Sequence, residues 1–139
     1  MLVRNCIAAS FLAVLAFGCA QTHRAAMPAG VCEIASRPEK YNNLRVVIRA
    51  GVRATLHHQL VLTDASCDRL ITINAPQQLA QETEFKALMA TVYRGFPHDV
   101  GTPKASGVFR GTLRYRANEV PSIWLELHSI ENLRSGVAP

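Results

Sequence analysis

The chain has 139 residues, which is enough for one domain and a leader but too short for two domains with separate cores. Hydrophobic residues make up 49% and charged residues 18% of the chain, a composition that excludes wholesale disorder. Lys and Arg number 15 against 10 Asp and Glu, so the protein is basic, which suits an anionic partner without identifying one.

The first 20 residues have the pattern of an export signal. Arg4 supplies a positive charge near the N-terminus, and an apolar stretch from Ile7 to Phe17 follows it. This stretch is well short of the roughly 20 residues that a permanent membrane-spanning helix needs. No later segment is apolar enough to span a membrane, so we expect a mature protein that is soluble in itself, outside the inner membrane.

The segment AFGC at residues 16–19 resembles the lipobox of bacterial lipoproteins. The resemblance implies a signal peptide over 1–18, cleavage before Cys19 and a lipid on that cysteine. In a Gram-negative envelope, Ala20 after the lipidated cysteine resembles a signal for the outer membrane. The alternative is ordinary small-x-small cleavage after Ala20, which releases a protein without an anchor.

The rest of the chain is expected to divide into three parts. Residues 19–30 are small, polar and unpatterned, with Pro28 and Gly30 as breakers, and are predicted to form a tether. A domain over 31–134 and a short tail over 135–139 follow.

Both cleavage alternatives leave the same two cysteines, Cys32 and Cys67. An even pair in an exported protein favours a disulfide, and closing this loop would stabilise the fold by roughly 3–4 kcal/mol. The other interpretation is a pair of reduced, buried thiols. Because the chain has no C-x-x-C motif, neither a thioredoxin-like redox site nor a zinc knuckle is expected.

Hydrophobic periodicity predicts a mainly β domain with five strands and one long helix. The clearest strand is 44–56, where apolar side chains alternate with Arg45, Arg49 and Arg53, and where Gly51 suggests a bulge or a sharp coil of the strand. The apolar face of this strand consists of Val46, Ile48, Ala50, Val52, Ala54 and Leu56. The expected elements are, in order, a short helix 32–36 interrupted by Pro38, strands 44–56, 59–63 and 69–74, an amphipathic helix 77–93, and strands 106–116 and 122–130.

This order, with the helix between the third and fourth strands, is that of the five-stranded OB barrel. The stretch CEIASRPEKYNNLRVVIRAGV at residues 32–52 and the Asp-x-x-Cys of residues 64–67 resemble small exported bacterial lipoproteins with an OB-like domain, an uncharacterised group. The resemblance covers residues 31–131. It implies a five-stranded OB-like barrel and carries no catalytic signature, so it informs fold more than function.

Six arginines are the candidate binding residues. In an OB barrel the first and fourth strands pair, so their outward arginines would merge into one basic stripe for nucleic acid, anionic glycan or lipid headgroups. The alternative is a solvated outer face whose long side chains protect the strands from aggregation. The candidates are Arg45, Arg49, Arg53, Arg110, Arg114 and Arg116.

The sequence gives little indication of nucleic-acid binding, metal binding or catalysis. Strand parity leaves Trp124 as the single aromatic side chain on an outer strand face, which is too few for base stacking, so nucleic acid is not the expected partner. His57 and His58 are adjacent and would point to opposite sides of a strand, and we expect surface histidines, no metal and no cofactor. Ser66, Asp64 and the histidines match no catalytic motif, so we expect no enzyme.

We therefore expect a lipid-anchored envelope protein that faces the periplasm and acts as a non-enzymatic binding or protein-interaction module. Its partners would be the membrane, through the anchor, and an envelope protein or anionic polymer. The alternative function is a secreted OB-fold protein that binds an anionic oligosaccharide or nucleic acid through its basic strand face.

Overall fold

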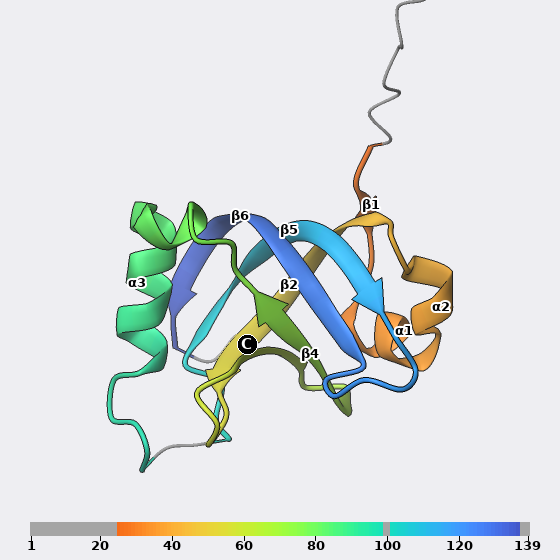
Figure 1. The fold of residues 1–139 in the computed structure, drawn as a ribbon. Helices are drawn as coiled ribbons and strands as arrows, with labels where there is room; N and C mark the ends of the chain where they lie inside the picture. Colours follow the sequence, from red (N-terminus) through yellow and green to blue (C-terminus); the bar gives the residue numbers. More distant parts are fainter. Residues whose placement is uncertain (1–24, 99–100, 137–139) are drawn as a thin grey trace, which may run out of the picture.

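The computed structural model describes residues 25–98 and 101–136, which form a mainly β domain (Figure 1). Cys19, the proposed signal peptide and the start of the predicted tether lie outside the described residues. In chain order the elements are β1 (Met27–Pro28), α1 (Val31–Ser36), α2 (Pro38–Tyr41), β2 (Arg45–Ala54), β3 (Leu60–Asp64), β4 (Cys67–Asn74), the 3₁₀ turn η1 (Leu79–Gln81), α3 (Thr83–Val92), β5 (Ala105–Tyr115) and β6 (Ile123–Ser135).

The six strands form one sheet in the order β1-β2-β3-β4-β6-β5, and a further pairing of β2 with β5 closes it. The long strands pair antiparallel except for β4 and β6, which run parallel over three residues. The expected mainly β architecture is confirmed, as is a helix between the third and fourth long strands. The expectation of five strands is wrong by one, because a two-residue strand such as β1 has no periodicity to detect.

Strand β2 follows its predicted alternation because one of its faces is turned into the closed sheet. Val46, Ile48 and Val52 are fully buried there, while Arg45 and Arg49 are exposed. Leu56 was expected on the buried face, but β2 ends at Ala54 and Leu56 is 67% exposed in the loop that follows.

Gly51 sits in an unbroken register with both β3 and β5, so the predicted bulge is absent at this position. A Cβ there would lie 3.0 Å from the hydroxyl of Thr63 and 3.2 Å from Pro103, so the glycine makes room for its neighbours. The register shifts of the sheet occur instead after Thr63 and twice along β5.

The helices cover the two ends of the sheet (Figure 1). Phe85, Leu88 and Val92 of α3 are buried at one end, as their spacing predicted. The helix is shorter than expected, because extended backbone at Glu82 (ψ 146°) separates η1 from α3 within the predicted 77–93 segment. At the other end, Val31 and Ile34 of α1 are buried.

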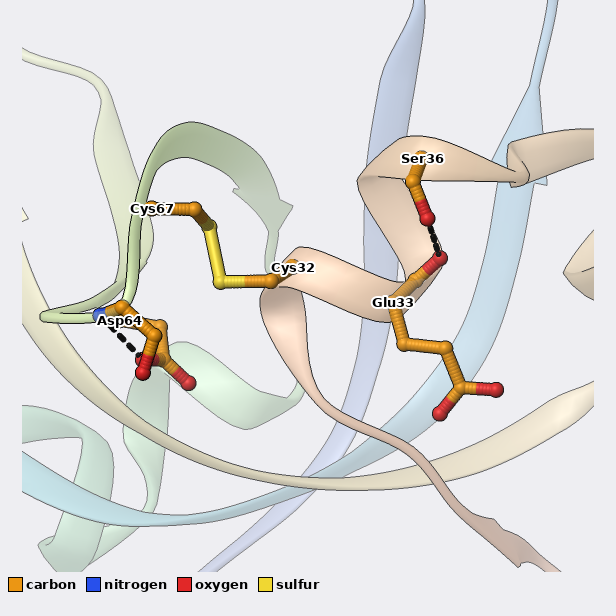
Figure 2. Close-up of a disulfide and its surroundings, with 6 residues drawn as sticks. Cys32, Glu33, Ser36, Asp64 and Cys67 are labelled. Carbon is orange, nitrogen blue, oxygen red and sulfur yellow. Dashed lines mark hydrogen bonds between the residues drawn. A yellow bond between two sulfur atoms is a disulfide. The ribbon is translucent and has the colours of Figure 1, made fainter.

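The disulfide between Cys32 and Cys67 is confirmed, and it links α1 to the first residue of β4 (Figure 2). The turn before β4 is tight: the carboxylate of Asp64 accepts a hydrogen bond of 2.8 Å from the backbone N–H of Ser66. This bond lowers the pKa of Asp64, because it favours the charged carboxylate. The turn and the disulfide together hold the N-terminal helix on the sheet.

Both ends of the predicted domain differ from the structure. Met27–Pro28 falls within the segment predicted as a tether, yet it pairs in parallel with Val46 and Val47 of β2. At the other end β6 runs to Ser135, past the predicted end of its strand at residue 130. The extension pairs with the start of β5, and positive φ at Asn132 interrupts its alternation, which is why the sequence pattern does not reveal it.

Candidate functional site

The structure brings five of the six predicted arginines to the outer face of two neighbouring strands. Arg45, Arg49 and Arg53 point outward from β2, and Arg110 and Arg114 point outward from β5. The expected pairing of these strands is confirmed. The sixth arginine, Arg116, lies just beyond the end of β5.

Register places Arg110 opposite Val47, and therefore diagonally between Arg45 and Arg49. Three arginines thus gather at the first half of β2 and the middle of β5, while Arg53 and Arg114 lie near the ends of their strands. Whether they bind an anion stays a prediction.

Three of the arginines already have acidic partners. Arg110 Nε lies 2.6 Å from Glu131, Arg114 Nη2 lies 2.9 Å from Glu126, and Arg116 Nη1 lies 2.6 Å from Glu119. The hydrogen bond that each guanidinium donates to its carboxylate partner raises the pKa of Arg110 and of Arg116, and the bond accepted from Arg110 lowers the pKa of Glu131. Within the described part of the chain, Arg49 and Arg53 have no such ion pair.

A groove of about 490 Å³ runs along the outside of β4, between α3 and the loop that joins β5 to β6. Most of its lining is apolar, and its polar groups are two amides, two hydroxyls, one imidazole and one carboxylate. The apolar lining includes Ile73, Phe85, Met89, Val120, Pro121 and Trp124, and the polar lining includes Gln59, Thr72, Asn74 and Glu119.

Trp124 is the central aromatic residue of this groove. It lies at the start of β6 beside Thr72 of β4, on the outer face that strand parity predicted, and it is half-buried. The guanidinium of Arg116 sits 5.7 Å from the indole centroid, close enough for a cation–π contact. Val120, four residues earlier, is fully exposed at 101%.

Two aromatic rings of the groove lining, His58 and Tyr93, pack against Phe96. The centroid of His58 lies 4.9 Å from that of Phe96, and the Tyr93 and Phe96 centroids are 5.5 Å apart. The Tyr93 hydroxyl donates a 2.8 Å hydrogen bond to the carbonyl of His58, which ties the loop after β2 to the end of α3. Burial raises the pKa of Tyr93.

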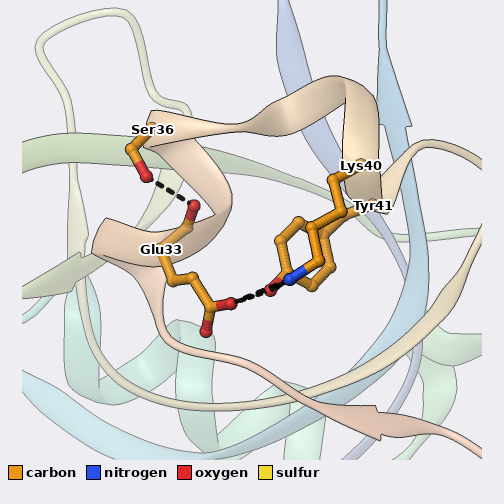
Figure 3. Close-up of polar contacts among 4 residues, drawn as sticks. All are labelled: Glu33, Ser36, Lys40 and Tyr41. Atoms are coloured by element: carbon orange, nitrogen blue, oxygen red, sulfur yellow. Dashed lines mark hydrogen bonds and ion pairs between the residues drawn. The ribbon is translucent and has the colours of Figure 1, made fainter.

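A second polar cluster lies at the far end, where α1 meets α2 (Figure 3). The Glu33 carboxylate accepts hydrogen bonds from the hydroxyl of Tyr41 and from Lys40 Nζ. Tyr41 is only 1% exposed, and Glu33 provides the partner that its hydroxyl needs. We assign this cluster a structural role, because it satisfies a buried tyrosine.

The histidines predicted as surface residues are exposed, and His58 joins the aromatic end of the groove. Within the described ranges, no group of three or more His, Cys, Asp or Glu side chains is arranged to hold a metal ion. Nor does any helix of the described part of the chain have the length and apolarity needed to cross a membrane.

The groove is not apparent as a unit from the sequence. Its walls come from four separate segments, and of its lining residues only His58 and Trp124 were considered as candidates for chemistry. A usable signal was present in Phe85, Met89 and Tyr93, which recur along one side of a helix, and in the apolar Val120-Pro121 pair in an otherwise polar loop.

No protein-family model matches the chain, and no curated protein matches it. Among solved structures, the chain is similar to one assigned as an aspartyl-tRNA synthetase from Leishmania major Friedlin, with 18% identity and a TM-score of 0.45. The match covers 84% of this chain and 22% of that one, and likeness at this level carries no argument about fold or function.

Proposed function

We propose that this protein is a non-enzymatic binding module of the bacterial cell envelope, lipid-anchored through Cys19, that holds an uncharged ligand group in the groove along β4. Its architecture is proposed to be an OB-like barrel. The observation that carries the function is the groove itself, which is open and mainly apolar and whose one carboxylate is ion-paired with Arg116.

Strand connectivity supports the OB-like assignment. The five long strands close in the order β2-β3-β4-β6-β5, β4 and β6 run parallel, and α3 lies between β4 and β5. In OB folds the ligand face is built on the second and third strands and the loops that flank it. Here the corresponding strands are β3 and β4, and the groove lies there.

The chemistry of the lining favours an uncharged ligand group, such as an apolar segment of a protein partner. No Lys or Arg lines the groove, and its single carboxylate, Glu119, is paired with Arg116. The exposed Val120 and half-buried Trp124 offer apolar area that a partner can cover. Large aromatic side chains of this kind dominate the binding energy of protein interfaces.

The groove is tested with photo-crosslinking in cells, with the crosslinking residue placed at position 120. We expect one adduct of defined mass, lost in Trp124→Ala and retained in Arg45→Gln/Arg49→Gln, which alters the basic face and leaves the groove intact. The purified partner should bind the Trp124→Ala variant at least about tenfold more weakly. An adduct retained in Trp124→Ala and lost in the arginine variant would instead support the basic strand face.

The anchor is tested separately with radiolabelled palmitate. We expect label in the wild type and none in Cys19→Ser, with the labelled protein in the membrane fraction. An unlabelled wild type found in the soluble periplasmic fraction would support cleavage after Ala20, and the anchoring part of the proposal would be abandoned.

A further inference from the structure

We infer that the outer face of β2, β5 and β6 is the surface that this domain lays against an anionic lipid headgroup layer. We call it the arginine face; its arginines are Arg45, Arg49, Arg53, Arg110, Arg114 and Arg134. This inference rests on the anchoring proposed above, and it adds an orientation that anchoring alone does not provide.

The net charge of the domain is concentrated on this face. Among the described residues, thirteen are Lys or Arg and nine are Asp or Glu. Strands β2, β5 and β6 hold six of the basic and two of the acidic residues, which leaves four net positive charges. The remaining described residues hold seven of each sign and are therefore neutral overall.

The described chain begins beside these arginines. Ala25 and Ala26 line a hollow of about 250 Å³ together with Arg45, Arg110 and His128. Strand β1 then runs parallel to the first residues of β2, beside which Figure 1 draws it. The described chain therefore begins beside the arginine face, six residues after Cys19.

The distance from this point to an anchor is short. Cys19 and Ala25 are six residues apart in the sequence, so even a fully extended chain spans at most roughly 21 Å between them. Electrostatic attraction extends over a Debye length of roughly 8 Å at physiological salt. A lipid on Cys19 thus keeps Ala25 within about three Debye lengths of the headgroups, and attraction holds the face when the chain brings it within about one.

The face is suited to charge attraction rather than to insertion into the bilayer. The exposed large hydrophobic residues of the described chain are Leu56, Leu70 and Val120, and none of them lies on β2, β5 or β6. Glu126 and Glu131 pair with two of the arginines and reduce the charge without cancelling it. Arg49 and Arg53 have no ion pair within the described chain, and each is expected to favour association with an anionic surface roughly fivefold.

The experiment couples residues 19–139, which contain the whole described domain, to vesicles through a maleimide lipid. Cys19 is the one cysteine of this segment outside the disulfide, so the coupling reproduces the anchor whether or not a cell attaches a lipid there. Failure of cellular lipidation and failure of this inference are therefore separate results. Arginine modification by phenylglyoxal is then followed residue by residue with mass spectrometry.

We expect Arg45 and Arg49 to be modified roughly fivefold or more slowly on vesicles with 30% phosphatidylglycerol than on phosphatidylcholine. Arg69 and Arg94, exposed on β4 and after α3, are the internal controls and should react equally on both. Salt at 0.5 M should abolish the protection.

The matched variants extend the test. Arg45→Gln/Arg49→Gln should lose the protection of Arg110 on anionic vesicles, and Arg69→Gln/Arg94→Gln, with the same loss of charge, should keep it. Equal modification of Arg45 and Arg49 on both vesicles, or equal protection of the controls, would overturn the inference. Protection by dextran sulfate on neutral vesicles, with none from phosphatidylglycerol, would assign the face to an anionic polymer instead.

Discussion

Removing the disulfide with Cys32→Ser/Cys67→Ser should destabilise the domain without changing its fold. The two cysteines are separated by 35 residues in sequence, a loop whose closure contributes roughly 4 kcal/mol at 25 °C in the loop-entropy relation. Native contacts are expected to persist, because Val31 and Ile34 on either side of Cys32 are fully buried against the sheet. The loss therefore comes mainly from a less constrained unfolded chain.

The assay is urea unfolding followed by circular dichroism. With a slope of roughly 1.5–2.5 kcal/mol per molar urea, the midpoint should fall by roughly 1.5–3 M. Wild-type protein reduced with dithiothreitol should match the double variant. A loss below about 1 kcal/mol would refute the loop-entropy reasoning for this pair.

A second comparison separates the unfolded-state effect from docking of α1. Ile34→Ala, with the disulfide intact, should cost roughly 2–5 kcal/mol because it opens a cavity under the helix. If the disulfide acts on the unfolded chain, its loss and the Ile34 effect should add. If it mainly holds α1 in place, the triple variant should lose clearly less than the sum.

Two further predictions concern the sheet and the helical end. Gly111→Ala should lower the free energy of unfolding, measured in urea, by roughly 1–3 kcal/mol, because its Cβ would lie 2.3 Å from the carbonyl oxygen of Glu126. Gly30→Ala is the control, because a Cβ at Gly30 would have no atom within 4 Å. The hydrogen bond from Tyr41 is the main cause of the lowered pKa of Glu33. The ionised Glu33 therefore stabilises the fold fully above the ordinary carboxyl pKa of 4.5, and this stabilisation is lost as the pH falls through the lowered pKa. The urea midpoints of wild type and Glu33→Gln should therefore differ at neutral pH and converge in acid; a constant difference would contradict this.

The hydrophobic periodicity of the sequence was sufficient to predict an element where burial of one face determines its structure. Val46, Ile48 and Val52 alternate with outward residues because one face of β2 is enclosed, and Phe85, Leu88 and Val92 follow the turn of a helix packed at one end. Both patterns depend on the near neighbours in sequence and on the presence of a core, which is why they are readable without a structure.

The ionic partner of each arginine on the neighbouring strand could not be predicted from the sequence pattern. Arg114 meets Glu126 in the register set by the β5–β6 hairpin, and Arg110 meets Glu131 after the register shift between Arg110 and Gly111. A one-residue change in register would give each arginine a different neighbour. The sequence therefore predicts an outward arginine correctly while leaving its ionic partner, and hence its available charge, undetermined.

The groove and the arginine face adjoin at β6, and most of their residues come from different strands. The groove is lined by α3, β3, β4 and the β2–β3 and β5–β6 loops, with Trp124 as its one contribution from β6, and no residue of β2 or β5 takes part. The arginine face lies mainly on β2 and β5, and Trp124 stands opposite its Arg114 in the β5–β6 register. A domain attracted to a membrane through Arg45 and Arg49 would therefore keep Val120 open to a partner, with Trp124 at the boundary between the two surfaces. Orientation by charge and binding in the groove are then independent properties, so the arginine variants should change the first and leave the second intact.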